Sequence, residues 1–291
     1  MLNIEDSRMA RKHEQISNDE PVQNLKSTKP KHHFGLRLIM VITGLIFFMS
    51  LLFSRTVLNS TYMSHQVVSS SIGSNIEQSV NSQLQKYGVN NQDIVPEGAI
   101  NQVVQKMAEQ LYAGQTVQVD QQIVSSVVNN GLKNSNSNAT ALGMGLSNTI
   151  ASQAVNVINN QLNTNQLNTY ASDIQTLVNV NRITMIISGV LLVIWFVLAV
   201  FSLIFVSAIS STLFWTGLLS GIGFGAVYLS NIVGQLSNQY QVASDLIKQV
   251  GNDVLTTGFL AAIIMAVVGI ILWIIVKITH FRSKKMKLGN N

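Results

Sequence analysis

The stretch from Ile183 to Gly234 constrains this chain most, because it holds 52 consecutive residues without a charged residue or a histidine. As one α-helix it would extend roughly 78 Å at ~1.5 Å per residue. The hydrocarbon core of a bilayer is only about 30 Å thick. We therefore expect two membrane spans, 183–206 and 213–234, folded back on each other. The polar cluster at 207–212 predicts the break between them.

Two further apolar segments predict spans at 38–54 and 257–276. The first also has the apolar character of a secretory signal peptide. Its 37-residue leader and the lack of an A-x-A-like site after it favour an uncleaved signal anchor. Charged residues make up only 11% of the chain, against about 25% in soluble domains. The expected fold class is therefore an all-α membrane protein with four transmembrane helices.

Residues 56–181, between the first two spans, are rich in amides, with Asn or Gln at 36 of 126 positions. Apolar residues recur there at helical spacing, which predicts a helical domain rather than a disordered Asn/Gln-rich tract. We expect breaks at 88–91, 114, 129–131 and 163–165, and a short strand at Val117 and Val119 remains open. The apolar stripes comprise Val68, Ile72, Ile76, Val80 and Leu84; Ile100, Val103, Val104, Met107 and Leu111; Ile123, Val124, Val127 and Val128; Leu142, Leu146, Ile150, Val157, Ile158 and Leu162; and Leu167, Ile174, Leu177 and Val178.

The distribution of Lys and Arg predicts the topology. Residues 1–37 contain seven and residues 277–291 contain five, whereas 56–181 contain three. Positively charged loops stay in the cytoplasm, and four spans place both termini on one side. We expect cytoplasmic termini, an extracytoplasmic domain at 56–181 and a short extracytoplasmic segment at 235–256. Residues 1–37 read as a disordered tail, or as a docking segment that folds on a partner.

The sequence offers little for catalysis. There are no cysteines, and His65 is the only histidine in 56–181. None of the four predicted spans contains an ionisable residue, which argues against a proton-coupled pump. The scattered carboxylates fit helix caps better than paired acid–base work. We expect no catalytic residue, no cofactor and no metal site, and therefore a protein that is not an enzyme.

Small residues recur every four positions in the third and fourth predicted spans. This spacing lets helix backbones approach closely and predicts packing between the two spans. The basic C-terminal tail sets the topology and offers contacts to anionic lipid headgroups. The packing candidates are Gly217, Gly221, Gly225, Gly258, Ala262 and Ala266, and the lipid-contact candidates are Arg282, Lys284, Lys285 and Lys287.

The predicted layout is similar to two arrangements, by analogy only. Bacterial chemoreceptors and sensors place a helical outer domain between two spans. Four-span subunits of cell-division and macrolide-export ABC systems place a large outer domain between spans one and two. The preferred interpretation is a non-enzymatic multi-pass protein of a bacterial plasma membrane, whose outer domain binds a partner or an envelope cue. The alternatives are a transporter-associated subunit and, third, a membrane enzyme.

The expected partners follow from the same interpretation. They are the lipid bilayer and a membrane or cell-envelope protein, whereas nucleic acid is not expected, because the basic residues cluster at the span ends. An oligomer is compatible with the sequence.

Overall fold

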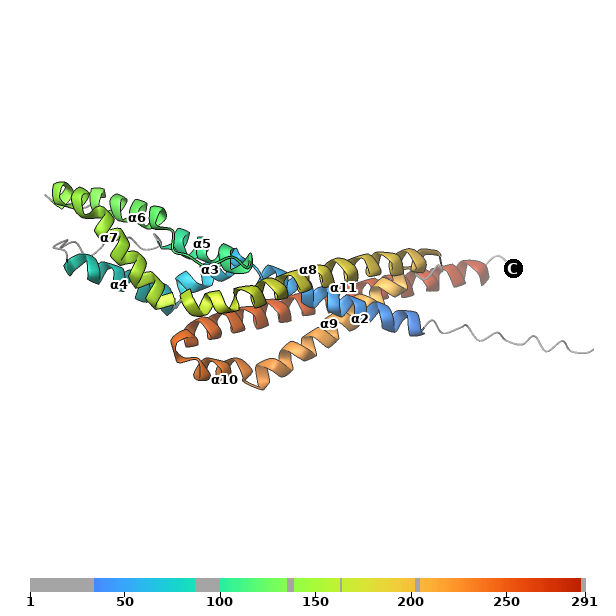
Figure 1. Ribbon diagram of the computed structural model, residues 1–291. Helices are drawn as coiled ribbons and strands as arrows, with labels where there is room; N and C mark the ends of the chain where they lie inside the picture. Colours follow the sequence, from blue (N-terminus) through green and yellow to red (C-terminus); the bar gives the residue numbers. More distant parts are fainter. Residues whose placement is uncertain (1–33, 87–99, 135–138, 163, 202–204, 289–291) are drawn as a thin grey trace, which may run out of the picture. The chain divides into compact units, whose positions relative to one another are not determined.

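The computed structural model describes residues 34–86, 100–134, 139–162, 164–201 and 205–288. The chain divides into two compact units, Met1–Gly35 and Leu36–Asn291, and the second contains the helical core and the candidate spans. Every regular element in the described ranges is helical, which confirms the predicted all-α class. The elements are α2 (Phe34–Arg55), α3 (Ser60–Ser69), α4 (Ser71–Lys86), α5 (Asn101–Tyr112), α6 (Gln121–Asn134), α7 (Ala139–Leu162), α8 (Thr164–Phe201), α9 (Phe205–Leu229), α10 (Ile232–Gln239), the 3₁₀ helix η1 (Gln241–Ala243) and α11 (Ser244–Leu288) (Figure 1).

Four of these helices, α2, α8, α9 and α11, are long and apolar enough to cross a membrane. The α2 and α11 helices contain the predicted spans 38–54 and 257–276, and α8 and α9 cover most of the predicted spans 183–206 and 213–234, which fits a multi-pass membrane protein. Two of them also extend beyond the spans. The α8 helix begins at Thr164, within the predicted domain, and α11 begins at Ser244, within the predicted polar segment.

The break between the second and third spans differs from the prediction. Residues 207–212 lie inside α9, whereas α8 ends at Phe201 and α9 begins at Phe205. The polar side chains of the cluster are used for packing instead of for a turn. The Ser210 hydroxyl donates to the Gly269 carbonyl of α11 at 2.9 Å, and the Thr212 hydroxyl donates to its own helix at Ala208, at 2.8 Å. A helix accommodates such hydroxyls because neighbouring carbonyls accept their hydrogen bonds.

The third predicted span also ends earlier than expected, at Leu229 instead of Gly234. Asn231 adopts a left-handed conformation with φ 52°, which separates α9 from α10. Asparagine is one of the few residues that visit this conformation readily. The predicted segment 235–256 consequently consists mostly of helix, in α10, η1 and the first turns of α11.

The core of the helical domain is built from the predicted apolar stripes. Ile76, Val103, Val128 and Ile158 are almost fully buried in one cluster contributed by α4, α5, α6 and α7. This cluster shows that the 3.6-residue periodicity marked the inward face of each helix. Leu177, in the last stripe, is 58% exposed and lies outside the cluster. The side chains of Leu84, Leu142 and Leu146, the break predicted at 88–91 and the tail 1–33 lie outside the described residues.

The apolar stripe from Val68 to Leu84 is divided between two helices, α3 and α4, although its spacing predicts a single helix. Ser70 has an extended conformation and ends α3, and its side-chain oxygen accepts from the Ile72 amide at 3.2 Å, at the start of α4. Serine is a favoured residue at such a helix start. Gly73 then lies against the Val68 carbonyl so closely that a Cβ would clash with it.

The segment after α5, which contains Val117 and Val119, does not form the short strand that the sequence left open. Gly114 ends the helix region with φ 68°, a conformation that glycine adopts without a steric penalty. Residues 115–120 then have no regular secondary structure. The Val117 amide donates to Asn168 Oδ1 at 2.5 Å, so a side chain replaces the partner strand. The predicted break at 129–131 lies inside α6, whereas the one at 163–165 coincides with the α7–α8 boundary.

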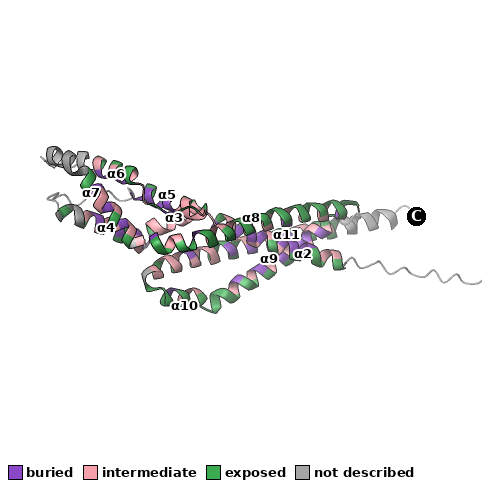
Figure 2. Ribbon diagram, viewed as in Figure 1, coloured by how far each residue is buried: buried purple, intermediate pink, exposed green. Residues whose placement is uncertain are grey.

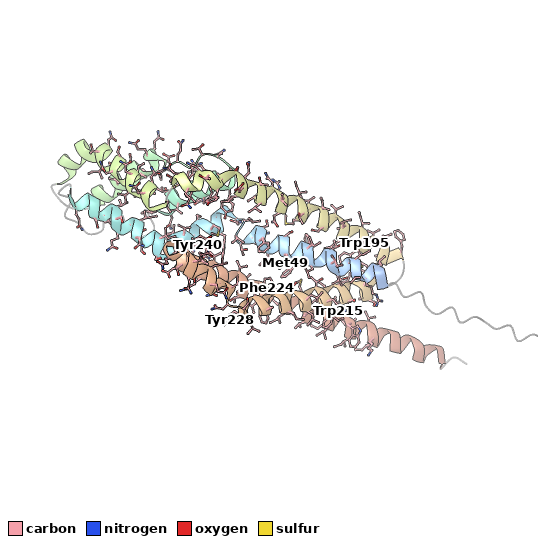
Figure 3. All side chains as sticks on the ribbon, turned by 60° about the horizontal axis from the view of Figure 1, so that its bottom comes forward. Met49, Trp195, Trp215, Phe224, Tyr228 and Tyr240 are labelled. Atoms are coloured by element: carbon pink, nitrogen blue, oxygen red, sulfur yellow. The ribbon has the colours of Figure 1, made fainter. Side chains whose placement is uncertain are left out.

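The spans are held mainly by the antiparallel pair α9 and α11. A Cβ on Gly217 would lie 2.6 Å from the Ala262 carbonyl oxygen, and one on Gly269 would lie 2.5 Å from the Phe214 amide nitrogen. The α2 helix adds Phe48, whose ring meets that of Phe224 edge to face. Met49, the next residue of α2, packs against the cluster that contains Phe224 (Figure 3). In Figure 2 the buried positions follow the facing sides of α2, α9 and α11, while α8 is exposed along most of its apolar part.

Candidate functional site

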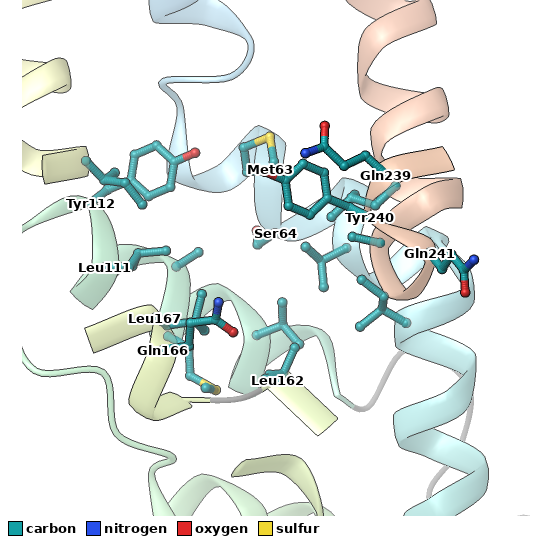
Figure 4. A pocket seen from close by; sticks show the side chains of 18 residues that line it. Met63, Ser64, Leu111, Tyr112, Leu162, Gln166, Leu167, Gln239, Tyr240 and Gln241 are labelled. Atoms are coloured by element: carbon teal, nitrogen blue, oxygen red, sulfur yellow. The ribbon is translucent and has the colours of Figure 1, made fainter. Parts of the chain in front are cut away.

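A pocket of about 740 Å³ lies in the helical domain (Figure 4). This volume lies within the range of about 300–1,000 Å³ that is typical of small-molecule sites. Its walls come from the helical domain and from the α10–η1–α11 segment. The lining residues are Met63, Ser64, Val67, Ile72, Val104, Met107, Ala108, Leu111, Tyr112, Leu162, Gln166, Leu167, Ile174, Gln239, Tyr240, Gln241, Ala243 and Leu246.

The pocket combines an apolar floor with an uncharged polar rim. Val104 and Met107 on the floor are buried and belong to the core cluster. Gln166, Tyr240 and Gln241 at the rim are exposed. None of the described lining residues carries a charge. The site therefore favours an apolar ligand body and hydrogen bonds from an uncharged group.

Two local features of the sequence create this hollow. The inward face of α5 carries Val104, Met107 and Leu111 at helical spacing, and Ala108 on the same face leaves the space beside them unfilled. On the opposite side the helix breaks at Tyr240, between α10 and η1, with φ −114° and ψ 72°. This break places Tyr240 and its glutamine neighbours at the rim (Figure 4).

Tyr112 joins the pocket to the end of the first span. Its hydroxyl donates to the Val57 carbonyl at 2.5 Å, just beyond α2. Burial raises the pKa of Tyr112 to about 12. The phenol is therefore neutral near pH 7, as a hydrogen-bond donor must be.

Tyr62 joins another wall of the pocket to the fourth span. Its hydroxyl donates to the Asp253 carboxylate of α11 at 2.5 Å. Burial raises the pKa of Tyr62, and the hydrogen bond and negative charge of Asp253 raise it further. A second bond runs from Gln249 Nε2 to Ser69 Oγ at 2.9 Å. Helix α3, which contributes Met63 to the pocket, is thus bonded to the helix that contains the fourth span.

The structure brings most of the predicted packing residues together. Gly217 lies against the backbone of Ala262 and Ala266, and a Cβ on Gly221 would be 3.9 Å from the Ala262 Cβ. Gly258 faces the ring of Phe224. Around Gly225, by contrast, a Cβ would meet nothing within 4 Å.

Gly269 also lies in this interface and was not among the predicted packing residues, although the sequence carries a signal for it. Gly269 follows Ala266 by three residues and continues the stripe of Gly258 and Ala262 along one face of α11. The tail candidates Arg282, Lys284, Lys285 and Lys287 fall within α11, but their side chains are outside the described residues.

The charged residues of the described chain do not assemble into a catalytic constellation at the pocket. His65 is exposed on α3 and is not among the lining residues. Within the described ranges, no group of three or more His, Asp or Glu side chains is placed to hold a metal ion. The chemistry that the pocket offers is apolar contact together with amide and phenol hydrogen bonds.

Comparison with known proteins adds no relative to this picture, because no protein-family model, no curated protein and no solved structure matches the chain.

Proposed function

We propose that this chain is a non-enzymatic multi-pass protein of a bacterial plasma membrane, whose helical domain lies outside the cytoplasm and binds a cue or a partner. The observation that carries the proposal is the direct connection between the walls of the pocket and the candidate spans. A domain that binds a ligand and is also bonded to several spans is suited to sensing. A ligand that prefers one arrangement of the pocket walls then shifts the spans toward the matching position.

The α8 helix is the first connection. Leu167 and Ile174 line the pocket, and the same helix continues without a described break to Phe201. Helices bend sharply at proline, at paired small residues or where a side chain or water enters the hydrogen-bond ladder. The α8 sequence contains no proline, and its one Gly/Ser pair, Ser188–Gly189, lies inside the predicted second span and not between the pocket and that span. It therefore favours a stiff link from the domain into the second span.

The α3 and α5 helices provide two further connections. Tyr62 bonds to Asp253 on α11, and Tyr112 bonds to Val57 after α2. Both tyrosines come from helices that line the pocket. A ligand that moves α3 or α5 therefore acts directly on groups attached to the fourth and first spans.

The orientation rests on the excess of Lys and Arg at the two ends of the chain. Because the chain has no cysteine, each introduced cysteine is a unique label. In intact cells, Gln122→Cys should react with an impermeant thiol reagent, whereas Ser7→Cys and Gly289→Cys should react only after lysis. Labelling of Ser7→Cys and Gly289→Cys in intact cells, with Gln122→Cys protected, would reverse the proposed topology.

Hydrogen exchange measured on the full-length protein in lipid nanodiscs tests the connection. Tyr62→Phe should increase exchange in α3 and also in the first turns of α11, because the bond to Asp253 is lost. Tyr170→Phe removes a phenol that is 49% exposed and serves as the matched control. A rise confined to α3 would show that α3 and α11 are not coupled through this bond.

Co-purification from native membranes separates the proposal from its runner-up. A partner held through the helical domain should be lost when exposed domain positions such as Gln102 and Gln122 are changed to Glu. An ATPase that remains bound to these variants would instead support a transporter-associated subunit.

A further inference from the structure

We infer that the pocket binds the apolar chain of an uncharged single-chain lipid, of the monoacylglycerol type, taken up from the bilayer. This inference rests on the proposed function and names the cue that the helical domain recognises. Three independent properties of the described residues support it: the size and lining of the pocket, its lack of charge, and its position beside a membrane-facing segment.

The size and lining fit one chain with a small head. At ~30 Å³ for a group the size of a water molecule, the pocket volume corresponds to about 25 such groups. This is the scale of one acyl chain with a glycerol head, and it is too small for the two long chains of a phospholipid. Met63, Met107 and Leu111 supply flexible and branched apolar surface for the chain. Methionine adapts readily to irregular apolar ligands.

The lack of charge selects the head group. An anionic head at the rim loses part of its hydration against the pocket wall and gains no cationic partner there, because the described lining contains no Lys, Arg or His. Gln239 and Gln241 offer amides that both donate and accept, which suits the hydroxyls of a glycerol head. The pocket is therefore expected to discriminate against a ligand of the same chain length with a permanent negative charge.

The position of the rim identifies the bilayer as the source. The short helix α10 follows the candidate span α9, and the rim residues are its last residue, Gln239, and the next two, Tyr240 and Gln241. Large apolar side chains are exposed along this stretch, with Leu229 84%, Ile232 43% and Leu236 44% exposed. Exposed apolar residues that directly follow a span are typical of a segment lying in the membrane interface. A lipid leaving the bilayer there reaches the rim without crossing water.

The test uses the full-length protein in nanodiscs with a photoreactive monoacylglycerol that carries a diazirine in its chain. Irradiation should label α3 and α5 at the pocket. Ala108→Trp should abolish this labelling by filling the pocket, whereas Ala113→Trp, at the end of the same helix but exposed and outside the lining, should retain it. Tyr240→Ala, at an exposed rim position, should reduce labelling without disturbing the fold.

Competition identifies the ligand class. Unlabelled monoacylglycerol should remove the pocket label, and an alkyl sulfate of equal chain length should not. Equal competition by the alkyl sulfate would overturn the inferred class of ligand while leaving the coupling between α3 and α11 untouched. Label found only on the spans, or unchanged pocket label in both Ala108→Trp and Tyr240→Ala, would overturn the site itself.

Discussion

The helical domain and the spans differ in the side chains that they bury. In the domain, large residues such as Ile76, Ile150 and Ile158 are buried and amides face outward. In the spans, many buried positions hold small or hydroxyl residues such as Ala208 and Ser210, a few hold large ones such as Phe48, and most of the large apolar residues are exposed (Figure 2).

The difference follows from the medium around each region. In water, burial of large apolar side chains drives packing. In lipid, apolar side chains gain little from burial, so helices associate through close backbone approach and hydrogen bonds. The domain therefore packs through large apolar side chains and the spans pack through close backbone contact. The α8 helix belongs to the domain at its start and to the second span at its end.

The largest expected effect separates these two kinds of packing directly. Ile158→Ala leaves a cavity in the domain core and should lower the free energy of unfolding by about 2–5 kcal/mol. Ile187→Ala removes the same atoms from a span position that is 55% exposed and should cost far less. Thermal unfolding of both variants in nanodiscs measures the comparison. Equal losses would show that the lipid-facing side of α8 is packed against protein.

The second prediction concerns close approach in the spans. Gly217→Ala forces a methyl group against the α11 backbone and should destabilise the protein by about 1–3 kcal/mol. Gly221→Ala makes an ordinary contact with Ala262, and Gly225→Ala enters open space, so both should be nearly neutral. Gly217→Ala should have the lowest melting temperature of the three variants, and the other two should melt close to the wild type. A large loss in Gly225→Ala would contradict the described register of α9 on α11.

The third prediction tests the bond that joins the two regions. Tyr62→Phe removes the hydroxyl that donates to Asp253 and should cost about 1 kcal/mol. Asp253→Asn keeps an acceptor oxygen and should cost less. Denaturation of the two variants, with Tyr170→Phe as the exposed control, measures the difference. If Tyr62→Phe were neutral, the hydrogen bond between Tyr62 and Asp253 would contribute nothing to stability.

The fourth prediction is a dependence on alkaline pH. The raised pKa of Tyr112, about 12 against 10.0 for a free tyrosine, favours the neutral phenol in the folded protein. Its stabilising contribution is complete below pH 10 and is lost as the pH rises through about 12. Tyr112→Phe should therefore lose less stability than the wild type between these pH values. Parallel pH profiles for the two proteins would argue against this burial.

The smallest expected effect concerns the polar cluster at 207–212. Ser210→Ala removes an interhelical hydrogen bond and should cost about 0.6 kcal/mol. Thr212→Val removes only a bond within α9 and serves as the control. No effect of Ser210→Ala would be expected if the cluster formed an exposed turn, so this variant also tests the helix boundary.

Hydrophobic pattern was sufficient to predict the inward faces of the domain helices. Val103, Val104 and Met107 were recognisable because a helix half in water repeats its apolar residues with a period of 3.6. In α9 and α11 the surrounding lipid is as apolar as the interior, so no such contrast exists. There the buried face was signalled only by small residues such as Gly217 and Ala262.

Other features depend on pairs that are distant in sequence. Tyr62 and Asp253 are 191 residues apart, and nothing in either local sequence indicates the other. The pocket likewise needs Ala108 on α5 opposite Tyr240 on the α10–η1 segment. The prediction of a break at 207–212 was wrong for a related reason. The carbonyl that accepts the Ser210 hydrogen bond lies on α11, far away in the sequence.

The contact between Gly189 and Phe47 limits how α8 can move. Leu167 in the domain core and Gly189 are 22 residues apart, about 33 Å along the helix and about 40° around it. A Cβ on Gly189 would lie only 3.2 Å from Phe47 Cε2, so the ring fits against the one residue without a side chain. Turning α8 by one position would drive Val190 or Ser188 into that ring. Rotation of α8 therefore requires the Phe47 ring to move, so this contact favours tilting of the helix over rotation about its own axis.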